Sequence, residues 1–130
     1  MTRIEPDSHV PVYLQIVEHL RGAIAAGVYK AGEALPSLRV LATDMRVNPN
    51  TVQRAYDELF RQGVVESQRG VGMFVARRGE RSARGRSEES VMSAFVQAVA
   101  MADACGLNVT RIRELFDEAL GQVRKTAGRS

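Results

Sequence analysis

An asparagine–proline pair, Asn48-Pro49, constrains this chain most because it marks where one helix must begin. Asparagine caps a helix by accepting a hydrogen bond from a backbone N–H of the first turn. Proline suits the first helical position because the N–H that it lacks would be unpaired there. A glycine stands at position 63, and the apolar residues between follow helical spacing, namely Val52, Ala55, Tyr56, Leu59 and Phe60. The pattern predicts a helix that starts at Pro49, buries this face and stops near Gly63.

The other face of this predicted helix is polar, with Asn50, Gln53, Arg54, Asp57 and Arg61. Such a helix is about 20 Å long and fits a DNA major groove, with its N-terminal residues nearest the bases. Asparagine and glutamine can pair with adenine, arginine with guanine, and a threonine methyl can contact thymine. The face therefore indicates a recognition helix, although capping alone would also explain Asn48. Arg61, like Arg46 before the helix, is interpreted as a solvated charge.

A shorter helix is predicted before it, capped by Ser37 and ending near Met45. Its apolar stripe comprises Leu38, Leu41, Ala42 and Met45. The connection from 46 to 48 is too short for anything but a tight turn, so the two helices are expected to cross steeply as a helix-turn-helix. Arg39 then lies in the first turn and points outward, where it would contact a phosphate or groove edge.

Two strand-like runs, 64–68 and 73–76, follow and are joined by Arg69-Gly70-Val71-Gly72. The glycines favour a hairpin, the wing of a winged helix. Arg69 at its tip could enter a minor groove, and amides near Gly70 and Gly72 could approach a phosphate; alternatively, both glycines serve only the turn. Upstream, a scaffold helix is predicted from Val12 to about Ala26, and the segment 28–35 is expected to supply a short strand partner for the wing.

The motifs LPSLRVLA, NPNTVQRAYDELFRQGVV and RGVGMFV, within about residues 9–78, resemble the GntR family of bacterial transcription regulators. The resemblance implies DNA contacts at Arg39, Asn48, Pro49, Asn50, Thr51, Gln53, Arg69 and Gly70. Arg54 is added from its exposed position, and Gly72 from the wing turn. Many relatives carry arginine where Pro49 and Gln53 stand, which leaves the preferred operator open.

Composition changes at Arg77, where arginine, glycine and serine replace apolar residues through Ser87. We interpret most of this segment as a solvated hinge, with a ragged helix start as the alternative. The predicted organisation is a DNA-binding domain at 1–78, a linker at 79–87 and a helical domain at 88–130. A flexible hinge would make the spacing between two DNA-binding heads the controlled variable.

Two more helices are expected beyond the linker, the first from 88 to about 105 and the second from a Thr110 cap to about Lys125. The first carries two adjacent apolar stripes, too wide for a single partner helix, so a homodimer is the economical solution. The residues assigned to the dimer are Val91, Met92, Phe95, Val96, Val99, Ile112, Leu115 and Phe116. So short a tail resembles the YtrA-like subfamily, which implies dimerisation through these helices and repression of transporter or neighbouring operons.

Several functions are disfavoured by composition. The net charge of +3 and pI near 9.5 are compatible with nucleic acid but do not decide the matter. Cys105 has no disulfide partner and is expected to be packed, and no apolar run suggests a signal peptide or membrane helix, so a cytoplasmic protein is implied. The two histidines lack a ligand cluster, and no catalytic motif is present, which disfavours metal binding, cofactors and an enzyme. A small-molecule effector of unknown identity and a winged helix that contacts only protein remain open.

Overall fold

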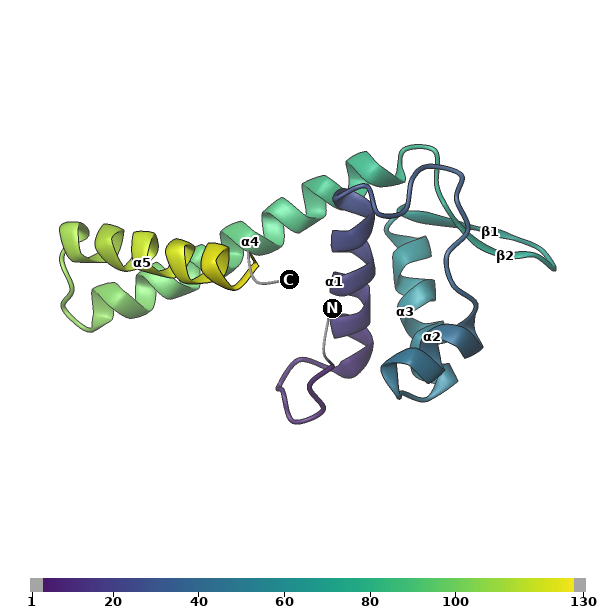
Figure 1. Cartoon of the computed structure of the whole chain (residues 1–130), viewed down its shortest axis with the longest axis horizontal. Coiled ribbons are helices and arrows are strands. Elements are labelled where there is room, and N and C mark those ends of the chain that lie inside the picture. Colours follow the sequence, from purple (N-terminus) through teal and green to yellow (C-terminus); the bar gives the residue numbers. More distant parts are fainter. Residues whose placement is uncertain (1–3, 128–130) are drawn as a thin grey trace. The chain divides into compact units, whose positions relative to one another are not determined.

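A computed structural model describes residues 4–127, and these residues form five helices and one hairpin (Figure 1). Contacts divide the chain into two compact units, 1–89 and 90–130. The mainly helical fold class with a small β-hairpin is confirmed. The elements are α1 (Val12–Ala25), α2 (Leu38–Met45), α3 (Pro49–Arg61), β1 (Val65–Gln68), β2 (Gly72–Val75), α4 (Gly79–Ala104) and α5 (Val109–Ala127).

The core of the first unit forms where α3 packs against both α1 and α2. Its large buried side chains include Ile16, Leu20, Tyr56 and Leu59, all less than 2% exposed. Phe60 was predicted to join them, but this prediction is wrong because the ring is 55% exposed. It lies next to Leu59 on the helix, at the edge of the apolar face, and within residues 4–127 its ring is left largely exposed.

Both helix starts that form the helix-turn-helix follow the sequence prediction. The Ser37 hydroxyl accepts from the backbone N–H of Val40 at 3.2 Å, and the Asn48 side-chain oxygen accepts from that of Asn50 at 2.8 Å. Between the helices, Arg46 adopts a left-handed conformation with φ 57°, which reverses the chain within a few residues. These caps and this turn set the angle at which α3 leaves α2.

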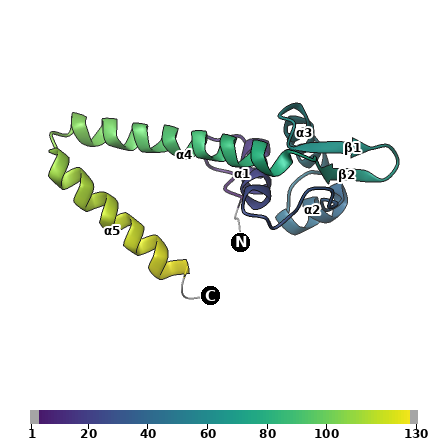
Figure 2. The ribbon, with the colours of Figure 1, turned by 90° about the horizontal axis from the view of Figure 1, so that it is seen from above.

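The wing is an antiparallel hairpin in which Gln68 pairs with Gly72 at the tip. The backbone N–H of Val71 donates to the carbonyl oxygen of Gln68 at 2.9 Å, and Gly70 has φ 77°, so the turn needs a residue that tolerates positive φ. Figures 1 and 2 show this hairpin projecting beyond α1, α2 and α3. A wing with an exposed tip is therefore present, as predicted.

The segment before α2 adds a short third pairing to the wing, as the sequence indicated. Ala34 forms an antiparallel bridge with Phe74, and the backbone N–H of Leu35 donates to the carbonyl oxygen of Met73 at 2.8 Å. This pairing ties the wing to the residues that lead into α2. The base of the hairpin is thus fixed to the helix-turn-helix.

The expected hinge at 79–87 is corrected by the structure, because these residues form the first turns of α4. Gly79 and Ala83 are buried, and a side chain at position 79 would collide with the carbonyl oxygen of Val64. Close packing on the core, rather than helix propensity, explains why this arginine- and glycine-rich segment is ordered. Control of the spacing between two DNA-binding heads stays a prediction.

The second unit comprises the rest of α4, from position 90, and α5. Asn108 caps α5, since its side-chain oxygen accepts from the backbone N–H of Arg111 at 2.8 Å, so the predicted Thr110 cap was wrong. The rings of Phe95 and Phe116 meet edge to face, with centroids 5.9 Å apart. Cys105, expected to be packed, is exposed in the single chain because it follows the last turn of α4.

Candidate nucleic-acid interface

The residues assigned to DNA come from α2, the N-terminal half of α3 and the wing. Nine of the ten are exposed, and Thr51 is half-buried. The exposed nine are Arg39, Asn48, Pro49, Asn50, Gln53, Arg54, Arg69, Gly70 and Gly72. The polar face predicted for α3 is therefore accessible to a ligand.

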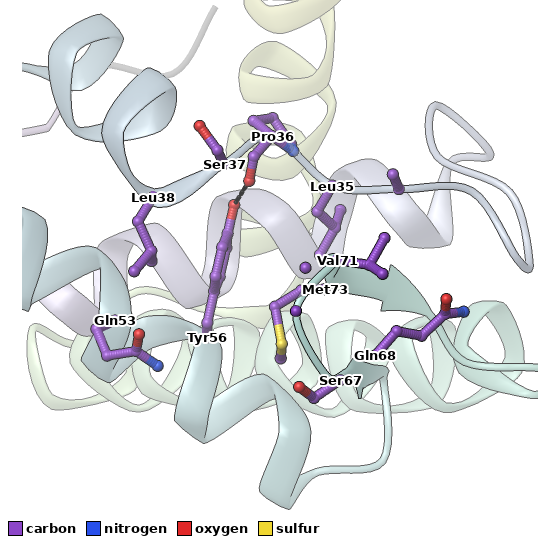
Figure 3. A pocket seen from close by; sticks show the side chains of 13 residues that line it. Leu35, Pro36, Ser37, Leu38, Gln53, Tyr56, Ser67, Gln68, Val71 and Met73 are labelled. Atoms are coloured by element: carbon purple, nitrogen blue, oxygen red, sulfur yellow. Dashed lines mark hydrogen bonds between the residues drawn. The ribbon is translucent and has the colours of Figure 1, made fainter.

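A hollow of about 440 Å³ separates α3 from the wing, and we call it the wing-side hollow (Figure 3). It brings together Gln53 of α3 with Gly70 and Gly72 of the wing, as part of a lining formed by positions 34–38, 53, 56, 67, 68 and 70–73. Arg39 and Arg69 do not line it. The structure thus unites part of the assigned set around one concave surface.

The charges of Arg39 and Arg69 are not paired with another described side chain. Neither side chain makes a hydrogen bond or ion pair within residues 4–127, whereas Arg61 at the other end of α3 binds Glu58. Hydrogen bonding from Arg61 lowers the pKa of Glu58, so this pair stays ionised and internally balanced. Arg61 is thus paired at the surface, while Arg39 and Arg69 are available to contact an external anion.

Asn48 and Gln53 already make hydrogen bonds within α3 and its cap. The Asn48 oxygen is used for capping, which leaves its two amide N–H donors for another acceptor at the helix start. The Gln53 amide donates to the carboxylate of Asp57 at 2.8 Å, one turn later. The amide nitrogen carries two N–H donors, so the bond to Asp57 leaves one donor and the amide oxygen of Gln53 for bidentate pairing with adenine.

Tyr56 was predicted only as a core residue, but its hydroxyl also holds two elements together. The hydroxyl donates to the carbonyl oxygen of Pro36 at 2.5 Å, along the edge of the wing-side hollow (Figure 3). Burial raises the pKa of Tyr56, so the hydroxyl stays protonated as a donor. The bond fixes α3 to the segment that leads into α2 and Arg39.

Tyr13 is a residue near the interface that the sequence analysis missed. Its ring lies under the guanidinium of Arg54, 3.9 Å from ring centroid to the Arg54 Cζ atom. The pair joins α1 to α3, positions far apart in sequence, and the helical pattern of Tyr13 had suggested scaffold alone. No signal in one sequence links these two residues.

Two further features of the described residues concern metal sites and membrane spans. Within residues 4–127, no group of three or more histidine, cysteine, aspartate or glutamate side chains is placed to hold a metal. Among the described helices, none has the length and apolar character required to cross a bilayer.

Residues 12–75 match the family described as bacterial regulatory proteins, gntR family. Over 124 residues the chain is 32% identical to the HTH-type transcriptional repressor YtrA of Bacillus subtilis (strain 168), covering 95% of each protein. The chain belongs to the gntR family. The recognition of these motifs in the sequence is therefore confirmed, and similarity to YtrA extends through the C-terminal helices.

Solved structures agree with this membership of the gntR family. A GntR family transcriptional regulator from Listeria monocytogenes superposes with a TM-score of 0.71 at 30% identity, covering 86% of this chain and 97% of that one. The DNA-binding domain of AraR in complex with operator ORE1 superposes with a TM-score of 0.52 at 26% identity, over 58% and 93% of the two chains. The chain is a DNA-binding transcription regulator with a winged helix-turn-helix, and its family consists of regulators rather than enzymes.

Proposed function

We propose that this gntR-family regulator represses transcription as a homodimer, with α3 and the wing of each protomer placed on one half of a near-palindromic operator. The observation that carries the proposal is the pair of exposed arginines without a bond in residues 4–127, Arg39 in α2 and Arg69 in the turn of the wing, which flank α3 in the sequence. Cations beside a recognition helix fix its register on the phosphate backbone, while α3 reads the bases. The named repressor YtrA, similar along nearly the whole chain, supports the direction of regulation.

The second unit supports the homodimer. Seven of the eight side chains assigned to the dimer are exposed in the single chain, and only Ile112 is half-buried. An apolar surface of this kind is covered in most stable proteins, and a second copy presents the same surface with twofold symmetry. Two recognition helices would then meet half-sites about 34 Å apart or a multiple of that.

Two further expectations belong to this proposal. A regulator that acts on operators works in the bacterial cytoplasm, where the DNA lies. Release from the operator by a small-molecule effector also stays a prediction, since neither hollow of the first unit has a lining that identifies a ligand.

Selection of binding sites from random duplex DNA, followed by affinity measurements on the enriched site, tests the proposal. We expect a near-palindromic sequence and, for Arg39→Ala or Arg69→Ala, a loss of about tenfold or more in affinity, because each removes a charge-assisted hydrogen bond. Arg124→Ala removes the same charge from the last turn of α5 and serves as the matched control. Wild-type affinity in both arginine variants, with the fold intact, would refute the assigned surface.

A further inference from the structure

The contact between Arg54 and Tyr13 is the one aromatic–cation stack that the described residues form, and it lies at the edge of the proposed DNA surface. Arg54 is exposed on α3, and Tyr13 is half-buried in the first turn of α1. A guanidinium over a ring face at 3.9 Å is within the range of a favourable cation–π interaction. The stack therefore limits where an otherwise long and mobile side chain can lie.

The way Arg54 is held leaves its charge available. Asp57, one turn along α3, is bonded to Gln53, and Arg54 forms no ion pair within residues 4–127. A stacked guanidinium uses its flat face, whereas its five N–H donors point outward in the plane of the group. Arg54 is thus oriented without being neutralised, which suits recognition of an external anion.

The position of Arg54 on α3 indicates which part of DNA it meets. Gln53 lines the wing-side hollow, while Arg54 lines a second hollow of about 360 Å³ on a different flank of α3, together with Pro11, Val12, Tyr13, Asn50 and Thr51. We call this the α1-side hollow. A helix in a major groove has one phosphate strand along each flank, because the groove is only about 12 Å wide. The α1-side flank therefore faces backbone, and base edges lie between the flanks.

We propose that Tyr13 is a positioning residue, which holds Arg54 in the α1-side hollow for a backbone phosphate of the operator. The proposal rests on the docking of α3 in the major groove given above. A phosphate contact of this kind adds affinity on every sequence and fixes the orientation of α3, while base readout falls to side chains of α3 that reach the base edges. Tyr13 acts through Arg54 and needs no contact with DNA itself.

The salt dependence of operator affinity tests the proposal, with the selected duplex as the probe. For Arg54→Gln, we expect the slope of log K against log salt to become shallower by about 0.9, the value for one phosphate contact. Tyr13→Leu, which removes the aromatic face, should weaken binding roughly two- to fivefold, while Tyr13→Phe, which keeps the face, should bind like wild type. In an Arg54→Gln background, Tyr13→Leu should cause no further loss.

Controls separate positioning from a loss of fold or of net charge. Tyr13 packs against the core, so thermal unfolding is measured for each variant. If Tyr13→Leu lowers operator affinity equally in the wild-type and Arg54→Gln backgrounds, the ring acts only through α1. That result would overturn the proposal. An unchanged slope of log K against log salt in Arg54→Gln would also overturn it. The same holds if Arg61→Gln, which removes the same charge from the last turn of α3, changes this slope as much as Arg54→Gln does. Wild-type operator affinity in Arg39→Ala would instead refute the docking surface of the proposed function.

Discussion

The Tyr56 hydroxyl shows, at the scale of a single residue, how one polar atom can position a surface. Its ring belongs to the core, and its hydroxyl donates to the Pro36 carbonyl oxygen. For Tyr56→Phe, we expect a loss of about 1–3 kcal/mol in the free energy of unfolding, because a buried hydrogen bond is removed and its acceptor is left unpaired. Urea denaturation followed by circular dichroism measures the change, and a stability equal to wild type would contradict it.

The same hydroxyl gives a pH dependence with a defined sign. Burial raises the pKa of Tyr56 in the folded protein above its unfolded value of about 10. The stabilisation that follows from the raised pKa is complete below about pH 10 and is lost as the pH rises toward the folded value. We expect the stability difference between wild type and Tyr56→Phe to shrink above about pH 10. A difference that stays constant from about pH 8 to about pH 11 would show that the hydroxyl is not held protonated.

Residues whose roles are local could be predicted from the sequence, and those that depend on a distant neighbour could not. Ser37 and Asn48 cap helices because their own side chains reach the next backbone N–H groups. Tyr13 finds its partner 41 positions away in sequence, counting from 13 to 54. Phe60 follows the apolar period of α3, but its exposure depends on whether another element covers that edge.

At the scale of the element, the start of α4 shows tertiary packing that outweighs sequence pattern. Arginine, glycine and serine give no apolar period in 79–87, so no periodic signal favours a helix there. The helix is nonetheless supported by burial of Gly79 and Ala83 and by an Arg84–Glu80 ion pair at 2.7 Å. The winged helix-turn-helix, by contrast, was predictable because caps, apolar stripes and turn glycines all point to the same fold.

Two glycines of α4 offer a matched pair of substitutions. Gly79→Ala should cost more than about 2 kcal/mol in the free energy of unfolding, because the added carbon meets the Val64 carbonyl oxygen and the Val75 side chain. Gly85→Ala, six residues later with open space around it, should instead stabilise the protein by about 0.5–1 kcal/mol through helix propensity. Urea denaturation measures both, and similar effects at the two positions would show that 79 is not closely packed.

At the scale of the whole molecule, the second unit lacks a core of its own. No side chain of α5 is buried, and large apolar residues such as Met92, Val96 and Val123 are about 60% exposed or more. Two helices cannot enclose this much apolar surface, as their pattern already indicated in the sequence. Which residues would face a second copy in the proposed homodimer could not be predicted in detail, because the two stripes of α4 are adjacent and either can be covered.

Substitution of Val99 tests whether this surface joins two copies of the chain. Val99 is 48% exposed in the single chain, and in the proposed homodimer a glutamate there would place a carboxylate in an apolar interface at a cost of several kcal/mol. We therefore expect Val99→Glu to sediment as a monomer and to bind the palindromic operator much more weakly, since each head then binds without the benefit of its partner.

The matched control for Val99→Glu is Gln97→Glu, which adds the same charge to an exposed polar position of α4 two residues away. Successive helical residues are about 100° apart, so 97 and 99 lie on nearly opposite sides of the helix. The control should stay dimeric and bind like wild type. A dimer with wild-type operator affinity in Val99→Glu would remove this face as the interface, while a monomer with undiminished affinity would show that one head suffices for binding.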